Sequence, residues 1–167
     1  FSDPLAEGPV IQLSSHQALM QGVTLETCLD VAKCLRDGGV DTPLVFMGYY
    51  NPILAYGIEG FCESAAASDA DGLIVPDLPT EEAGPLRKAA KAAGLDLIPL
   101  LALTSSDARI AEACADASGF VYCVSVLGTT GARETVSDRV TGLVEKVRSY
   151  TTLPAAVGFG ISRAEHV

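Results

Sequence analysis

The 167-residue sequence contains no tryptophan, only two histidines, and few charged residues, which make up 19% of the chain. Apolar runs such as 97–103 are far shorter than the roughly 20 residues needed to span a bilayer. The two histidines, His16 and His166, lie far apart, and the cysteines form no CxxC pair. This pattern does not indicate a zinc site. The apolar fraction of 49% is ample for a buried core and argues against disorder.

The five cysteines are spaced irregularly, and no pairing pattern emerges from them. We expect all of them to be reduced packing residues in a reducing compartment. The expected location is the cytoplasm, or a plastid if the source is a photosynthetic eukaryote. Residues 1–4 contain no methionine and no basic region, so we expect the chain to be an internal piece of a longer protein rather than to start with a signal peptide.

Acidic residues outnumber basic residues by 21 to 11, which makes the formal net charge −10. No basic stripe indicates nucleic-acid binding, and an anionic membrane surface would repel such a chain. If this protein binds a phosphate, backbone N–H groups and helix N-termini must hold it.

Short apolar runs alternate with longer amphipathic stretches along the chain. The alternation predicts strands at 43–49, 72–76, 97–101, 120–124 and 155–157. It predicts helices at 14–37, 57–69, 80–93, 106–117 and 136–149, with a further helix from about Ser162.

The repeat length is about 28 residues, close to the roughly 31 of a (β/α)8 barrel, although a doubly wound sheet has similar units. We therefore predict an α/β fold of the TIM (β/α)8 barrel class. Five strands cannot close an eight-stranded barrel. We accordingly expect residues 1–167 to form one incomplete barrel domain, covering about strands 3–7 and lacking its N- and C-terminal parts.

In a barrel, the catalytic and substrate-binding residues lie in the loops that follow the strands. Glu7 lies in a loop stiffened by Pro and Gly and is a candidate acid/base group or a loop residue, whereas Asp3 is better explained as a turn cap. Tyr49 and Tyr50 must point to opposite sides of a strand end, so at most one of them faces a pocket. Asp77 could hold a neighbouring loop or a substrate.

Two further loops have the composition of ligand-binding segments. The segment 125–133 combines hydroxyl groups with glycines and is long enough to act as a lid. In 155–162 an apolar strand ends in Gly-Phe-Gly at the start of a helix, where barrels commonly bind phosphate.

The absence of certain residue types at the strand ends limits the classes of reaction that this sequence could catalyse. The four lysines all lie on predicted helices and none at a strand end, which argues against a Schiff-base aldolase. A metal-dependent site is disfavoured because no histidine–carboxylate cluster exists. Of the reaction classes considered, the one that remains is acid/base catalysis by a carboxylate, assisted by tyrosine and backbone groups.

Five motifs, spaced correctly along the whole chain, resemble the tryptophan synthase alpha family. They are Phe1–Pro9, Tyr50-Asn51-Pro52, Val75–Pro79 with Glu81-Glu82, Gly128-x-Thr130-Gly131, and Gly158–Ser162. Stretches 46–52 and 154–162 also resemble eukaryotic members, including fused fungal enzymes. The resemblance implies a lyase of tryptophan biosynthesis that cleaves indole-3-glycerol phosphate to indole and glyceraldehyde 3-phosphate. It implies no cofactor in this domain and docking of its loop face on a β subunit or fused β domain that contains PLP.

The resemblance also implies roles for individual residues. In the catalytic group, Glu7 would bond the indole N–H and Tyr122 would lie beside the reacting hydroxyl. The residues implied to bind the substrate or its phosphate are Tyr49, Ile74, Pro76, Thr130, Gly131, Phe159 and Gly160, with Asn51 and Asp77 positioning a loop. No metal ligand is implied.

The sequence departs from the family pattern in a few places. Glu7 stands where the family has Asp, and Val126 stands where bacterial members often have Arg. The family's catalytic Glu precedes the position of Phe1, and a further Gly-Ser phosphate contact follows that of Val167. Two alternatives remain: a related phosphate-binding barrel, such as phosphoribosylanthranilate isomerase or indole-glycerol phosphate synthase, and a non-catalytic module that binds and activates a β subunit.

Overall fold

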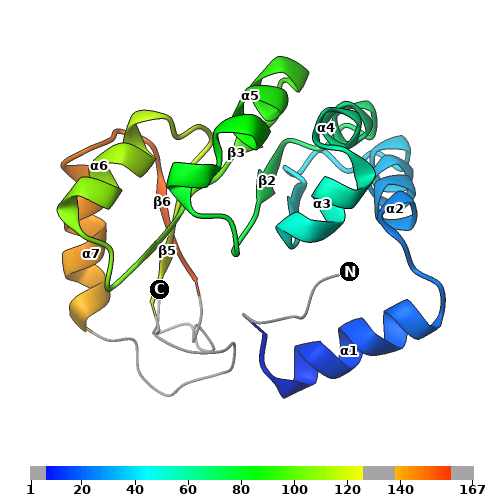
Figure 1. Cartoon of the computed structure of the whole chain (residues 1–167), viewed down its shortest axis with the longest axis horizontal. Helices are drawn as coiled ribbons and strands as arrows, with labels where there is room; N and C mark the ends of the chain where they lie inside the picture. The colour runs from blue at the N-terminus through cyan, green and yellow to red at the C-terminus, as the bar shows by residue number, and fades with distance from the viewer. Residues whose placement is uncertain (1–6, 126–137, 159–167) are drawn as a thin grey trace. The chain divides into compact units, whose positions relative to one another are not determined.

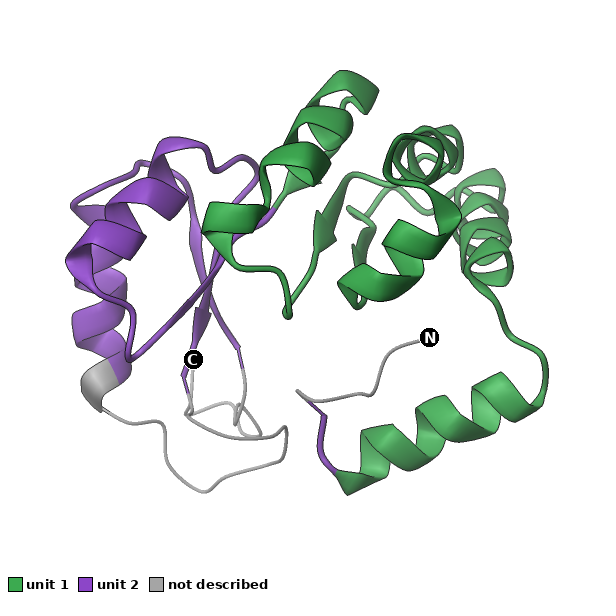
Figure 2. Ribbon diagram, in the orientation of Figure 1, with its two compact units in different colours: residues 1–4, 9–97 green, residues 5–8, 98–167 purple. Residues whose placement is uncertain are grey.

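The computed structural model describes residues 7–125 and 138–158. The chain divides into two compact units, coloured separately in Figure 2. Unit 1 comprises residues 1–4 and 9–97, and unit 2 comprises residues 5–8 and 98–167.

Unit 1 is a small parallel sheet with helices (Figure 1). Its elements are α1 (Pro9–Met20), α2 (Leu25–Asp37), β1 (Val45–Met47), α3 (Tyr50–Tyr56), α4 (Ile58–Ala67), β2 (Gly72–Ile74), a 3-10 turn (Thr80–Glu82), α5 (Gly84–Ala93) and β3 (Asp96–Leu97). The strand order is β1-β2-β3, and Gly72 of β2 pairs with Val45 on one side and Asp96 on the other. Such parallel neighbours require crossover connections, which the helices supply.

The core of unit 1 lies between β2 and the helices. Leu73 and Val75 pack there with Leu86 of α5 and Phe61 of α4. Ile74, between Leu73 and Val75 in the sequence, is buried but lies outside this cluster. Because strand side chains alternate between faces, Ile74 belongs to the opposite face of the sheet.

Unit 2 repeats this arrangement with a second parallel sheet. Its elements are β4 (Leu100–Ala102), α6 (Asp107–Ala115), β5 (Val121–Val124), α7 (Asp138–Arg148) and β6 (Ala155–Gly158), and the strand order is β4-β5-β6. Val121 and Cys123 of β5 pack against Ile110 of α6 and Val147 of α7. Tyr122 and Val124 are half-buried and project from the other face.

The predicted helix 14–37 is wrong, because the structure has two helices there, α1 and α2. Gly22 between them has a φ of +82°, a conformation that interrupts a helix and suits glycine. Thr24 then caps α2: its side chain accepts a hydrogen bond from the Thr27 N–H, and the Thr27 hydroxyl accepts one from the Thr24 N–H.

The predicted strand 97–101 is also corrected, since it is divided into β3, which pairs with β2, and β4, which pairs with β5. Pro99 lies at the division and has no N–H to donate to a sheet. The short helix α3 was not predicted, because its seven residues follow β1 after only two others. The remaining predicted strands and helices of the described part are confirmed to within a few residues.

All five cysteines are free, as expected, but only Cys62, Cys114 and Cys123 are buried. The packing interpretation is wrong for Cys28 and Cys34, which are exposed on α2. Burial raises the pKa of Cys62 and of Cys123 to about 11, which keeps these thiols protonated at neutral pH.

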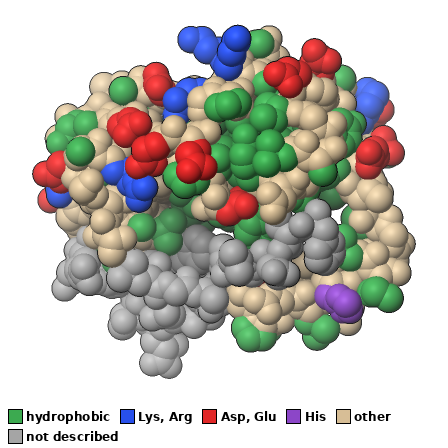
Figure 3. Space-filling view, viewed as in Figure 1, with side chains coloured by type: hydrophobic (Ala, Val, Ile, Leu, Met, Phe, Trp, Pro, Cys, Tyr) green, Lys and Arg blue, Asp and Glu red, His purple; other side chains and the backbone are tan. Residues whose placement is uncertain are grey.

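No helix within the described ranges is long and apolar enough to cross a membrane. Nor do three metal-binding side chains (His, Cys, Asp or Glu) group together in that part of the chain. On the face drawn in Figure 3, the basic side chains are scattered among acidic ones and form no patch.

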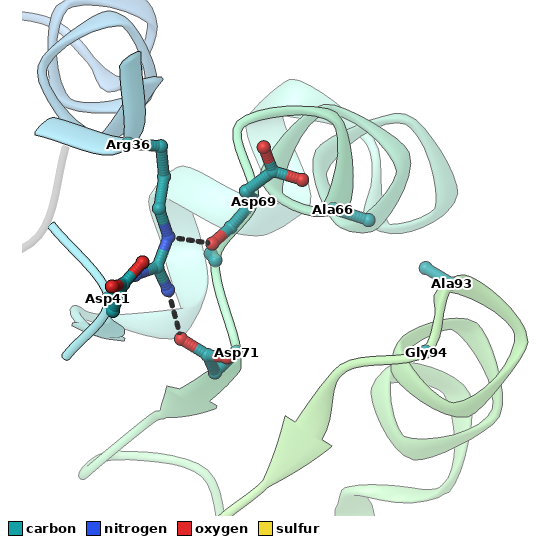
Figure 4. Close-up of a pocket in the computed structure, with 8 residues that line it drawn as sticks. Arg36, Asp41, Ala66, Asp69, Asp71, Ala93 and Gly94 are labelled. Carbon is teal, nitrogen blue, oxygen red and sulfur yellow. Dashed lines mark hydrogen bonds and ion pairs between the residues drawn. The ribbon is translucent and has the colours of Figure 1, made fainter. Parts of the chain in front are cut away.

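Arg36, at the end of α2, ties that helix to the amino ends of β1 and β2. Its guanidinium donates to the Val40, Thr42 and Asp69 carbonyls at 2.6, 2.9 and 2.9 Å. It also pairs with the Asp71 carboxylate at 2.5 Å, and Asp71 accepts the Leu44 N–H at 2.6 Å. Figure 4 shows the bonds from Arg36 to Asp69 and Asp71, beside a cavity of about 450 Å³ at that end of the sheet. Every acceptor is supplied by the segment that leads into a strand, so Arg36 fixes where β1 and β2 begin.

We predict that Arg36→Ala lowers the free energy of unfolding by about 1–3 kcal/mol, because several hydrogen bonds to a charged group are lost together. Lys33→Ala on the same helix is the matched control. Lys33 makes only an exposed ion pair with Asp37 at 3.6 Å, so its removal should cost no more than about 0.5 kcal/mol. Urea denaturation of the two variants measures both values, and equal losses would contradict the assignment.

Candidate functional site

The carboxyl ends of β5 and β6 bring together several polar groups of unit 2. Tyr122 pairs in register with Ala156, and Val124 pairs with Gly158. Ala155 and Val157 pack against the helix-covered core, so Ala156 and Gly158 share the opposite face with Tyr122. Beyond the strands, the Ser125 N–H donates to the Gly158 carbonyl at 3.1 Å, which extends the pairing by one residue.

The Tyr122 ring lies directly over Gly158. A Cβ atom built on Gly158 would be 1.7 Å from the Tyr122 hydroxyl oxygen and 2.1 Å from the adjoining ring carbon. The phenol therefore reaches along the sheet from β5 to the end of β6.

Glu7 belongs to the same compact unit and is half-buried. The pKa of Tyr122 is raised, first by burial and then by the negative charge of Glu7. A tyrosine in this setting stays protonated at neutral pH and can act as a hydrogen-bond donor. The charge of one predicted catalytic residue, Glu7, thus acts on the phenol of the other, Tyr122.

In unit 1, the predicted loop-positioning residue Asp77 caps helix α3 from the segment after β2. Its two carboxylate oxygens accept the Tyr50 N–H at 2.9 and 3.2 Å. Tyr49, the residue at the N-cap position, makes no capping bond with its own side chain. A carboxylate at a helix N-terminus satisfies an otherwise unpaired N–H and interacts favourably with the helix dipole. The partner of Asp77 is thus the Tyr50 backbone, whereas the side chain of Asn51 is exposed.

An apolar cavity of about 240 Å³ lies beside the carboxyl ends of β1 and β2. Most of its lining comes from α2, α3 and the hydrophobic core of unit 1, including Leu29, Leu73 and Val75, and two predicted substrate contacts, Tyr49 and Ile74, also line it. Tyr50, by contrast, packs against the hydrophobic core of unit 1. Pro76 is half-buried and is not among the residues that line the cavity.

Four predicted contacts, Thr130, Gly131, Phe159 and Gly160, lie outside the described residues, as does Asp3. Two contributors were missed by sequence reasoning: the Tyr50 backbone N–H and Gly158. Gly158 could have been found by counting strand positions, since it shares a face with Tyr122 once β5 and β6 are paired in register. No pattern in the sequence would have identified the Tyr50 backbone N–H as part of the site.

Comparison with known proteins identifies the family. The family model described as "Tryptophan synthase alpha chain" matches residues 1–167. The tryptophan synthase alpha chain of Roseiflexus castenholzii is 53% identical over all 167 residues, which span 64% of that relative. The alpha chain of Chloroflexus aurantiacus is 50% identical over the same residues, which span 63% of it.

Solved structures agree with this match. A chain of the Pyrococcus furiosus tryptophan synthase a2b2 complex superposes with a TM-score of 0.90 at 38% identity, covering 99% of this chain and 66% of that one. A protein of Aquifex aeolicus VF5 superposes with a TM-score of 0.88 at 41% identity, covering 99% and 62%. These matches confirm the TIM-barrel fold class.

The chain spans less than two thirds of the length of these relatives. The relatives named are prokaryotic, and the resemblance to eukaryotic members stays a prediction. Because the family model covers every residue and about half of the residues are identical in named relatives, the chain belongs to the tryptophan synthase alpha chain family.

Proposed function

We propose that the whole protein is a lyase that cleaves indole-3-glycerol phosphate to indole and glyceraldehyde 3-phosphate, the alpha reaction of L-tryptophan biosynthesis. Family membership supports the reaction. The observation that carries it within this chain is that the half-buried Tyr122 phenol lies over Gly158 near the carboxyl ends of β5 and β6, with its pKa raised in part by the Glu7 charge.

The reaction needs two proton movements around one carbon–carbon bond. A proton adds to the indole ring carbon that bears the glycerol chain, and positive charge develops on the ring nitrogen. The adjacent hydroxyl then loses its proton as the carbon–carbon bond breaks, which leaves indole and an aldehyde. A carboxylate beside the ring N–H stabilises the developing charge where it appears.

Glu7 is the residue proposed for that carboxylate. Tyr122 is proposed to lie beside the reacting hydroxyl, and its raised pKa keeps the phenol protonated, so that it can donate a hydrogen bond. The acid/base Glu that moves the protons is proposed to lie upstream of Phe1 in the whole protein. This division of roles keeps one carboxylate for charge stabilisation and another for proton transfer.

The remaining residues are proposed to shape the binding site. Tyr49, Ile74 and Pro76 would contact the indole ring. Thr130, Gly131, Phe159 and Gly160 would bind or cover the phosphate. Asp77 would hold the start of α3, which contains Asn51, and its bond to the Tyr50 N–H supports that role.

The backbone is the proposed source of phosphate affinity, because the chain carries a net charge of −10. We further propose that the whole protein binds a tryptophan synthase β subunit or a fused β domain, that PLP resides there, and that this domain uses no cofactor. The solved relative named as an a2b2 complex supports such a partner. We propose the cytoplasm as its location, in keeping with the bacterial relatives.

A second candidate is a non-catalytic alpha-like module that only binds and activates the β subunit. Glu7 in place of the family's Asp is the observation in its favour, because misplacing a reacting group by about 1 Å can cost on the order of 100-fold in rate.

We predict that Glu7→Gln in the whole protein lowers the rate of indole release by at least about 100-fold, as expected when a group that stabilises developing charge is lost. Glu7→Asp, which keeps the charge on the family's own side chain, should retain more activity than Glu7→Gln. Glu112→Gln is the matched control, since Glu112 is exposed on α6 and its loss changes the net charge equally. The measurement is indole formation from indole-3-glycerol phosphate.

An unchanged rate in Glu7→Gln would refute the role of Glu7. A folded whole protein that binds a β subunit but releases no indole would favour the non-catalytic module.

We predict a linked change in the titration of Tyr122. Its phenol should ionise above the ordinary tyrosine value of about 10, because burial and the Glu7 charge both raise its pKa. Removing the charge with Glu7→Gln should lower this pKa without restoring the ordinary value, since burial is the larger cause. The absorbance of phenolate, with Tyr122→Phe subtracted to isolate one tyrosine, provides the measurement.

A further inference from the structure

We draw no further inference here: the strongest candidate, the apolar cavity of about 240 Å³ beside the edge strand β1, is lined by the exposed residues Cys28 and Met47 as well as by the core of unit 1, and nothing in the described part of the chain shows what covers it.

Discussion

Parallel pairing of strands is the constraint from which the rest of this structure follows. Two parallel neighbours cannot be joined by a tight turn, so each connection must cross back along the sheet, usually as a helix. In both sheets the helices cover one face, as Leu73 with α5 and Cys123 with α6 illustrate. In each sheet, the carboxyl ends of the strands then lie at one edge. The loops that follow these strands lie together at that edge, whatever their sequences.

The acidic side chains at the amino ends of the strands differ in their partners from the one at the carboxyl ends. At the amino ends, Asp71 is paired with Arg36 and accepts a backbone N–H, so its charge is compensated. At the carboxyl end of sheet β4-β5-β6, Glu7 lies near a phenol whose pKa it raises. The first arrangement serves stability, because it joins a helix to two strand starts. The second has no evident benefit for folding and is better explained by chemistry.

The sequence predicted the fold class well, because the fold class depends on periodic patterns of apolar residues that can be read along the chain. Runs such as 120–124 are apolar, of strand length, and bounded by glycine or polar residues. The errors fall where one residue overrides a pattern. Gly22 interrupts an otherwise continuous apolar periodicity, and Pro99 divides a run that looks like one strand.

The site was predicted only in part, for a related physical reason. For charged and aromatic residues such as Glu7, Tyr122 and Asp77, the residue type itself indicates the chemistry that the side chain can perform. A contribution made by backbone, such as the Tyr50 N–H, or by the absence of a side chain, as at Gly158, has no residue type to reveal it. Such contributions appear only when strand register places two positions together.

The Glu at position 7 is best understood through the group it faces. The carboxylate of Glu7, which lies just before α1, has one methylene more than Asp and so places its charge farther from the backbone. The Tyr122 phenol extends across Gly158, and the charge of Glu7 contributes to its raised pKa. A change in the position of that carboxylate therefore alters the electrostatic environment of Tyr122.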